Sequence, residues 1–179
     1  THSSESDTVE KDLKKGDFLG FIARPINYML FRLSNRAANF VLTGTTILPF
    51  IIVISLVSAP NTPLIFFLPL ALVLASLGFV ASFEIYYSIG LLTFWLEEVW
   101  GVKRGIGIIA WLLSGSMFPL HILPNTLQIL AQALPFKHQA AVPAQLLLGQ
   151  AGIAQFLESA LILVAWIGIL YMVQKWIWK

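Results

Sequence analysis

Three long apolar stretches constrain this chain more than any other feature of its sequence. Residues 37–59, 64–95 and 154–176 contain few charged side chains, and each is long enough to cross the roughly 30 Å hydrocarbon core of a membrane as a helix. Only 11% of the residues are charged and the mean hydropathy is +0.81, whereas about a quarter of the residues of a soluble domain are charged. The sequence therefore predicts an all-α integral membrane protein, a polytopic helical bundle.

A fourth apolar stretch, residues 105–118, is too short to cross the membrane as a helix. It would span roughly 20 Å at about 1.5 Å per residue, and Pro119 is expected to end it. Pro124 then opens a second short segment, which stops at Pro135 and has leucines on one helical face and amides on the other. A broken helix is tolerated at membrane depth only where protein or a water-lined cavity receives the freed backbone groups. The break therefore predicts a pathway or cavity near one face of the bundle.

The positive charges indicate how the chain is oriented. Residues 97–105 are predicted to form a short charged loop, and residues 136–152, rich in Gln, Ala, Pro and Gly, a second loop. If each apolar stretch carries the chain across, every Lys and Arg other than Lys137 lies on the same side as both termini. By the positive-inside tendency that side is the cytosol. We therefore expect a protein of the cell (inner) membrane whose broken segment faces outward.

Residues 1–36 differ in character from the rest. They begin as a polar, charged linker, and from residue 18 onward apolar residues recur at helical spacings, interrupted by Arg24 and Arg32. Pro25 should divide this part into two short amphipathic pieces. Two interpretations remain open: a helix that anchors the first span at the membrane surface, or a docking element for a cytoplasmic partner. We place the domain boundary here, with residues 37–179 as the transmembrane domain.

Two features of the second apolar stretch are candidates for packing and function. Ala71, Ala75, Gly78 and Ser82 follow one another at i, i+4, i+7 and i+11, a seam of small residues that would let another helix approach closely. Glu84 is the only carboxylate well inside an apolar run, and acids within membranes are functional candidates. It lies roughly 30 Å along a straight helix from the start of the stretch, so snorkelling or a local ion pair is the alternative interpretation.

Several classes of function are excluded or disfavoured by the sequence. The chain has no cysteine, which excludes disulfides and thiolate metal sites, and its three histidines lack metal-ligand spacing, so no metal site is expected. No glycine-rich phosphate loop is present, so the chain should not bind ATP by that route or be an enzyme in itself. Its basic residues flank apolar spans and do not form a nucleic-acid-reading surface.

The segment from residue 112 to residue 149 resembles the second half of ABC-2 type permeases. Members of that family carry a Ser-Gly, then a Pro, a Leu-Pro, a Leu-Pro-Phe and a late Pro before a Gly. The matching residues here are Ser114, Gly115, Pro119, Leu123, Pro124, Leu134, Pro135, Phe136, Pro143 and Gly149. Residues 16–31 are similar to a Gly, Leu and Arg-Pro stretch that follows the second span in a branch of bacterial six-span ABC-2 permeases.

The resemblance implies specific roles for parts of the chain. It would supply the third to sixth spans of a six-span permease, with two further spans expected before Thr1. Residues 119–150, with Ser114 and Gly115 before them, would form an outward re-entrant helical hairpin that caps the exit of the pathway. The amphipathic region would contain a coupling helix that rests on a cytoplasmic ATP-binding subunit. The residues expected at that contact are Asp17, Phe18, Arg24, Pro25 and Arg32.

The function that follows is the permease subunit of an ATP-binding-cassette exporter. The resemblance implies that ATP and Mg bind to the partner subunit, with no cofactor in this chain, and that a second permease copy or a paralogue completes the pathway. The apolar composition favours an amphiphilic or lipid-like substrate. The alternative is a passive channel or a structural membrane bundle without ATP coupling.

Overall fold

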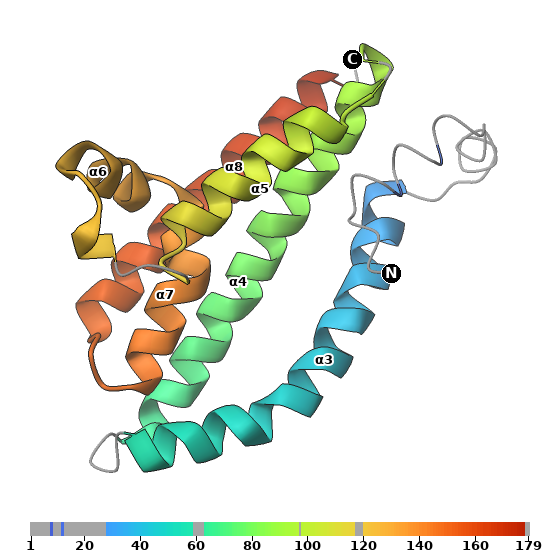
Figure 1. The fold of residues 1–179 in the computed structure, drawn as a ribbon. Coiled ribbons are helices and arrows are strands. Elements are labelled where there is room, and N and C mark those ends of the chain that lie inside the picture. Colours follow the sequence, from blue (N-terminus) through green and yellow to red (C-terminus); the bar gives the residue numbers. More distant parts are fainter. Residues whose placement is uncertain are drawn as a thin grey trace.

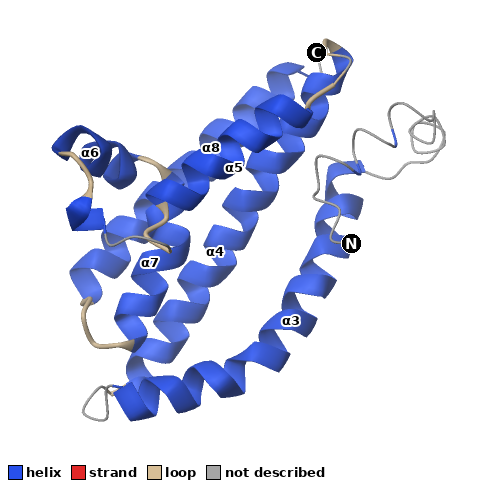
Figure 2. Cartoon of the chain, in the orientation of Figure 1, coloured by secondary structure: helices blue, strands red, loops and turns tan. Residues whose placement is uncertain are grey.

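The fold is seen in a computed structural model that describes residues 8, 12, 28–58, 63–96, 98–116 and 120–177, without the side chain of His121. Helices make up nearly all of this part of the chain, and no strand occurs in it (Figure 2). The all-α fold class is therefore confirmed. The helices carry the labels α3 to α8 along the chain (Figure 1).

Three helices are long and apolar enough to cross a membrane: α3 (Tyr28–Ser58), α4 (Leu64–Leu91) and α8 (Ile153–Ile177). A short 3₁₀ turn, η1 (Leu92–Phe94), continues α4. They correspond to the three long apolar stretches. The helix of the first span, however, starts before the expected boundary at residue 36 and runs through it without a break, because no proline or glycine between its start and that point interrupts it.

The helix α5 (Trp100–Leu113) corrects two expectations about the fourth stretch. It begins inside the segment predicted to be a loop, so Lys103 and Arg104 are helical, as suits two residues of good helix propensity. It also ends before the proline that was expected to stop it. Gly115 follows its end with φ of 74°, a left-handed conformation that commonly terminates helices and that glycine adopts without steric cost.

The proline-broken segment folds as a helical hairpin. A short 3₁₀ turn, η2 (Leu120–Ile122), precedes α6 (Asn125–Ala133), which lies between the two prolines that were predicted to bound it. The next segment was predicted to be a loop, which is wrong: it forms α7 (Pro135–Leu147). Its first proline occupies the first helical turn, where a missing N–H costs nothing. Figure 1 shows α6 projecting from the bundle and α7 running beside the long helices.

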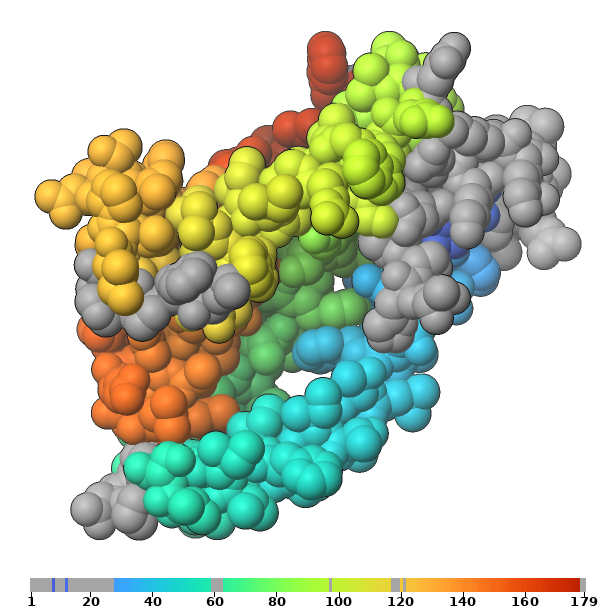
Figure 3. Space-filling view, in the orientation of Figure 1, coloured from blue at the N-terminus to red at the C-terminus, as the bar shows by residue number. Residues whose placement is uncertain are grey.

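The helix α4 is the centre of the packing, with α7 and α8 against it. Its core cluster joins Ala71, Leu74 and Ala81 of α4 to Val142 and Leu146 of α7, and also includes Leu163 of α8. The helix α3, which contains Pro49, bows away from this core in Figure 1, and Figure 3 shows openings between the two.

The helix α3 is joined to the rest at separate points along its length. The Phe40 ring stacks on Phe79 with centroids 4.5 Å apart, and the Ser55 hydroxyl donates to the carbonyl of Leu147 at 2.6 Å. Most of its apolar side chains are exposed. Such a surface fits a lipid environment or a further membrane-embedded partner.

Candidate functional site

The hairpin is fastened to the bundle by a buried histidine. His138 of α7 is 1% exposed, and its Nε2 lies 2.8 Å from the carbonyl oxygen of Gln132 in α6. A carbonyl only accepts, so Nε2 donates. In the neutral imidazole Nδ1 then accepts from the Ser159 hydroxyl of α8 at 2.8 Å. One imidazole therefore joins the end of α6 to both α7 and α8.

A tryptophan of α8 forms a hydrogen bond with Ala133, the residue that follows Gln132 at the end of α6. The indole Nε1 of Trp166 in α8 donates to the carbonyl of Ala133 at 2.8 Å. The last carbonyls of a helix have no partner inside it, and in a membrane such groups need a partner from neighbouring elements. His138 and Trp166 supply two of these partners. Sequence reasoning did not single out either residue, although a histidine and a serine in largely apolar surroundings were an available signal.

A cavity of about 470 Å³ lies between the end of α5, α7 and the start of α8. The sequence predicted a pathway or cavity near one face of the bundle, and the lining of this one is largely polar. The polar residues that line it are Lys137, His138, Gln145, Gln150, Gln155, Glu158 and Ser159. It therefore offers amides and one charge of each sign to a passing polar group.

The pKa of His138 is set mainly by its burial. His138 belongs to α7, which is not one of the three helices long enough to span a membrane. Burial lowers the pKa of His138, and the nearby Lys137 lowers it further. The hydrogen bond to the Gln132 carbonyl and the carboxylate of Glu158 act in the opposite direction without overcoming burial. The lowered pKa favours the neutral imidazole, in which Nδ1 accepts from the Ser159 hydroxyl.

The predicted hairpin residues that the structure describes lie around this cavity and its support. Gly115 lines the cavity, and the preceding Ser114 is buried, with its Oγ 2.7 Å from the Oγ of Ser116. Phe136 is buried in a cluster with Leu113 and Ala131, so it joins α7 to α5 and α6. Pro124 and Pro135 bound α6, and Pro119 lies outside the described residues.

The predicted seam of small residues lies where α7 comes closest to α4. A Cβ built on Gly78 would lie 2.5 Å from the Cβ of Gln139 and 2.9 Å from its Cα. The Ser82 hydroxyl donates to Oε1 of the same Gln139 at 2.7 Å. Ala71 is buried in the core cluster and Ala75 is half-buried. The small side chains let α7 approach α4 closely. The sequence had predicted a loop in place of α7.

Glu84 is buried between α4 and α8, at 3% exposure, so its carboxylate does not snorkel to the surface. Gln174 of α8 donates through Nε2 to the carboxylate and, at 3.0 Å, to the Ser88 hydroxyl. The Oε1 atom of Gln174 has no hydrogen-bond partner within the described part of the chain. Gln174 was missed because a single amide near the end of an apolar stretch resembles an ordinary boundary residue.

The start of α3 meets the end of α4 beside this cluster. The Tyr28 hydroxyl donates to Oδ2 of Asp12 at 2.7 Å, and Nη1 of Arg32 lies 3.8 Å from the same oxygen. The ring centroids of Tyr28 and Tyr87 are 6.3 Å apart. Arg32 is therefore engaged with its own chain. The other residues expected to contact an ATP-binding subunit lie outside the described part: Asp17, Phe18, Arg24 and Pro25.

Comparison with known proteins places the chain in a family. A family model described as ABC-2 family transporter protein matches residues 1–179. No curated protein and no solved structure matches the chain. The match agrees with the three apolar helices, and it assigns the chain to the membrane part of a transporter, not to the ATPase. The chain therefore belongs to the ABC-2 family of transporter proteins and is a permease component of an ABC transporter.

Proposed function

We propose that this permease component forms the translocation pathway of an ATP-driven exporter, and that the α6–α7 hairpin caps the exit of that pathway. The observation that carries the proposal is the polar cavity of about 470 Å³ beside the hairpin. The hairpin is held by side chains of α7 and α8, His138 and Trp166. Movement of α8 against α4 would therefore move the hairpin as well.

The drive for that movement is proposed to come from a cytoplasmic subunit that binds ATP and Mg. Residues 1–36 would contact this subunit through the predicted coupling residues. Within this region, Asp12 contacts Tyr28 and Arg32 at the start of α3. Tyr28 in turn lies against Tyr87 of α4. A displacement of the region would thus reach two spans. ATP shifts the permease between states only if the two states differ in their contacts with the ATP-binding subunit.

A second permease copy or a paralogue is proposed to complete the pathway. The exposed apolar surface of α3 supports this, because side chains such as Leu42, Phe50 and Val57 are more than half exposed. The distribution of Lys and Arg supports an inner-membrane protein with both termini in the cytosol. The apolar composition of the chain as a whole supports an amphiphilic or lipid-like substrate.

The test is transport with the ATP-binding partner present. The permease is reconstituted into liposomes with its ATP-binding subunit, and the movement of a fluorescent phospholipid between leaflets is followed with and without ATP. We expect movement that requires ATP and stops when the catalytic glutamate of the ATPase is replaced. Movement that persists with the inactive ATPase would favour the passive channel instead.

The role of the cavity is tested separately within the same assay. Ala141 lines the cavity, whereas Ala144, on the same helix, is exposed and does not. We expect Ala141→Phe to lower ATP-dependent movement by about ten-fold, since obstruction of a pathway by about 1.4 kcal/mol changes a rate by that factor. Ala144→Phe is the matched control. Equal transport by the two variants would contradict an exit at this cavity.

A further inference from the structure

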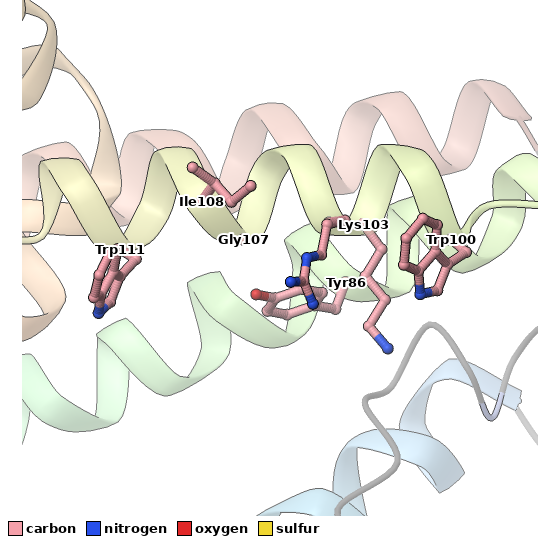
Figure 4. Close-up of a pocket in the computed structure, with 7 residues that line it drawn as sticks. Tyr86, Trp100, Lys103, Gly107, Ile108 and Trp111 are labelled. Carbon is pink, nitrogen blue, oxygen red and sulfur yellow. The ribbon is translucent and has the colours of Figure 1, made fainter.

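A second cavity lies between α4 and α5 and extends along α5 from Trp100 to Trp111. It measures about 480 Å³ and is lined by Tyr86 of α4 and by residues on one face of α5. In Figure 4, Trp100 and Trp111 stand at its two ends, with Tyr86 and Lys103 between them. We call this cavity the aromatic groove.

The α5 residues of the aromatic groove follow from the helical repeat. Relative to Trp100, Lys103 and Arg104 are at i+3 and i+4, Gly107 at i+7 and Trp111 at i+11, positions that share one face. The two cations are therefore near one end. From Lys103 to Trp111 the helix rises about 12 Å, so the other end extends along the apolar part of α5.

The charged side chains that the structure describes in the aromatic groove are of one sign. Lys103 and Arg104 line it, and no carboxylate occurs among the described residues that do so. Trp100 and Trp111 are 65% and 53% exposed. An exposed tryptophan such as Trp100, beside the two cations, is typical of the membrane boundary, where lipid headgroups meet acyl chains. The groove thus combines a cationic end with an aromatic, apolar remainder.

Gly107 keeps the middle of the aromatic groove open. A Cβ built there would meet no atom within 4 Å, so the space beside Gly107 is open and a large side chain at this position would occupy it. Gly105, two residues earlier, would likewise meet no atom, but it does not line the groove. The two glycines therefore offer a matched pair for a test.

We propose that the aromatic groove binds an anionic phospholipid of the adjacent leaflet. Its phosphate lies at Lys103 and Arg104, and an acyl chain lies over Gly107 towards Trp111. Charge complementarity selects an anionic headgroup, and the apolar length beyond the cations selects a lipid over a small anion. This site does not depend on the export function, because a lipid bound there can also support or regulate the permease.

The test measures lipid binding to the intact protein purified in detergent. Brominated phosphatidylglycerol is titrated in, and the quenching of tryptophan fluorescence gives a Kd, with brominated phosphatidylcholine as the neutral comparison. We expect phosphatidylglycerol to bind more tightly. Arg104→Gln should weaken it about five-fold, which corresponds to about 1 kcal/mol for one basic residue near an anionic surface. Arg104→Lys should restore most of the binding.

The glycine pair tests the position of the acyl chain. Gly107→Leu should weaken phosphatidylglycerol binding by at least as much as Arg104→Gln, whereas Gly105→Leu and Lys175→Gln should leave it unchanged. Equal binding of the two lipids, or equal effects of the two leucine variants, would overturn the proposal. So would inorganic phosphate that displaces the lipid, or a Gly107→Leu variant that changes only the oligomeric state.

Discussion

Single polar or small residues decide where the helices of this protein meet. His138 joins α6, α7 and α8, and Gln174 joins α8 to Glu84 and Ser88 of α4. Gly78 lets α7 approach α4. Between membrane helices, close packing and hydrogen bonds determine specificity, because lipid tails are as apolar as the side chains. Changes at these residues should therefore act on particular helix pairs.

Gly78→Ala should destabilise the contact between α4 and α7. The new Cβ would lie 2.5 Å from the Cβ of Gln139 and 2.9 Å from its backbone Cα, so a helix must shift, at a typical cost of about 1–3 kcal/mol. Gly168→Ala in α8 is the control, because a Cβ there meets nothing within 4 Å. Thermal unfolding in detergent checks this. A Gly78→Ala variant as stable as Gly168→Ala would contradict the close approach.

The stability of the hairpin should depend on pH through His138. Burial lowers the pKa of His138 in the folded protein, so the unfolded chain binds the proton more readily. The stability supplied by the neutral imidazole is therefore present above the unfolded pKa of about 6.5 and is lost as the pH falls through that value. Thermal unfolding measured from neutral to mildly acidic pH should show this fall.

The matched variant for the pH series is His138→Gln, which keeps hydrogen-bonding capacity without titrating in this range. His2 and His121 remain in it, so the comparison isolates His138. We expect a shallower loss of stability on acidification than in the unchanged protein. Parallel pH profiles would show that His138 does not carry the dependence.

At the scale of elements, the two prolines of α7 act in different ways. Pro135 lies at its first turn, a position that suits proline. Pro143 lies inside the helix and has no N–H to donate to the preceding turn. Both prolines are nevertheless buried against the core. Packing against α4 and α8 therefore compensates for an unfavourable local sequence in α7. The short α6 instead depends on side chains from other helices at its end.

Trp166→Phe should loosen α6 without disturbing the long helices. It removes the donor to the Ala133 carbonyl, worth about 0.5–1.5 kcal/mol, and keeps an aromatic ring. We expect amide hydrogen exchange in α6 to become several-fold faster, while exchange in α4 stays the same. Trp176→Phe is the control, since that side chain is 77% exposed. Uniform acceleration across the protein would instead indicate general destabilisation.

At the scale of the whole molecule, α4, α7 and α8 pack together as the core. The helix α3 touches this core at only a few points, among them Ser55 and Phe40. The cationic end of the aromatic groove, at Lys103 and Arg104, lies near the start of α5, and the polar cavity lies near its end. If α5 and the hairpin carry the chain across, the two sites face opposite sides of the membrane.

Accessibility labelling should place Lys103 and Lys137 on opposite sides. The chain has no cysteine, so Lys103→Cys and Lys137→Cys each create a single reactive thiol. We expect a maleimide that cannot cross the membrane to label only Lys137→Cys in intact cells, and both variants after permeabilisation. Labelling of both in intact cells, or of Lys103→Cys alone, would contradict the proposed orientation.

The sequence by itself determined the class of protein and the three long spans, because length and apolar composition decide whether a helix can cross a membrane. It also determined both ends of α6, which prolines bound directly. The tertiary structure decided that residues 136–147 are helical, since α7 is buried against α4 at Gly78 and Gln139. It alone revealed the partners of Glu84 and His138, because these bonds join residues distant in sequence whose pairing no local pattern encodes.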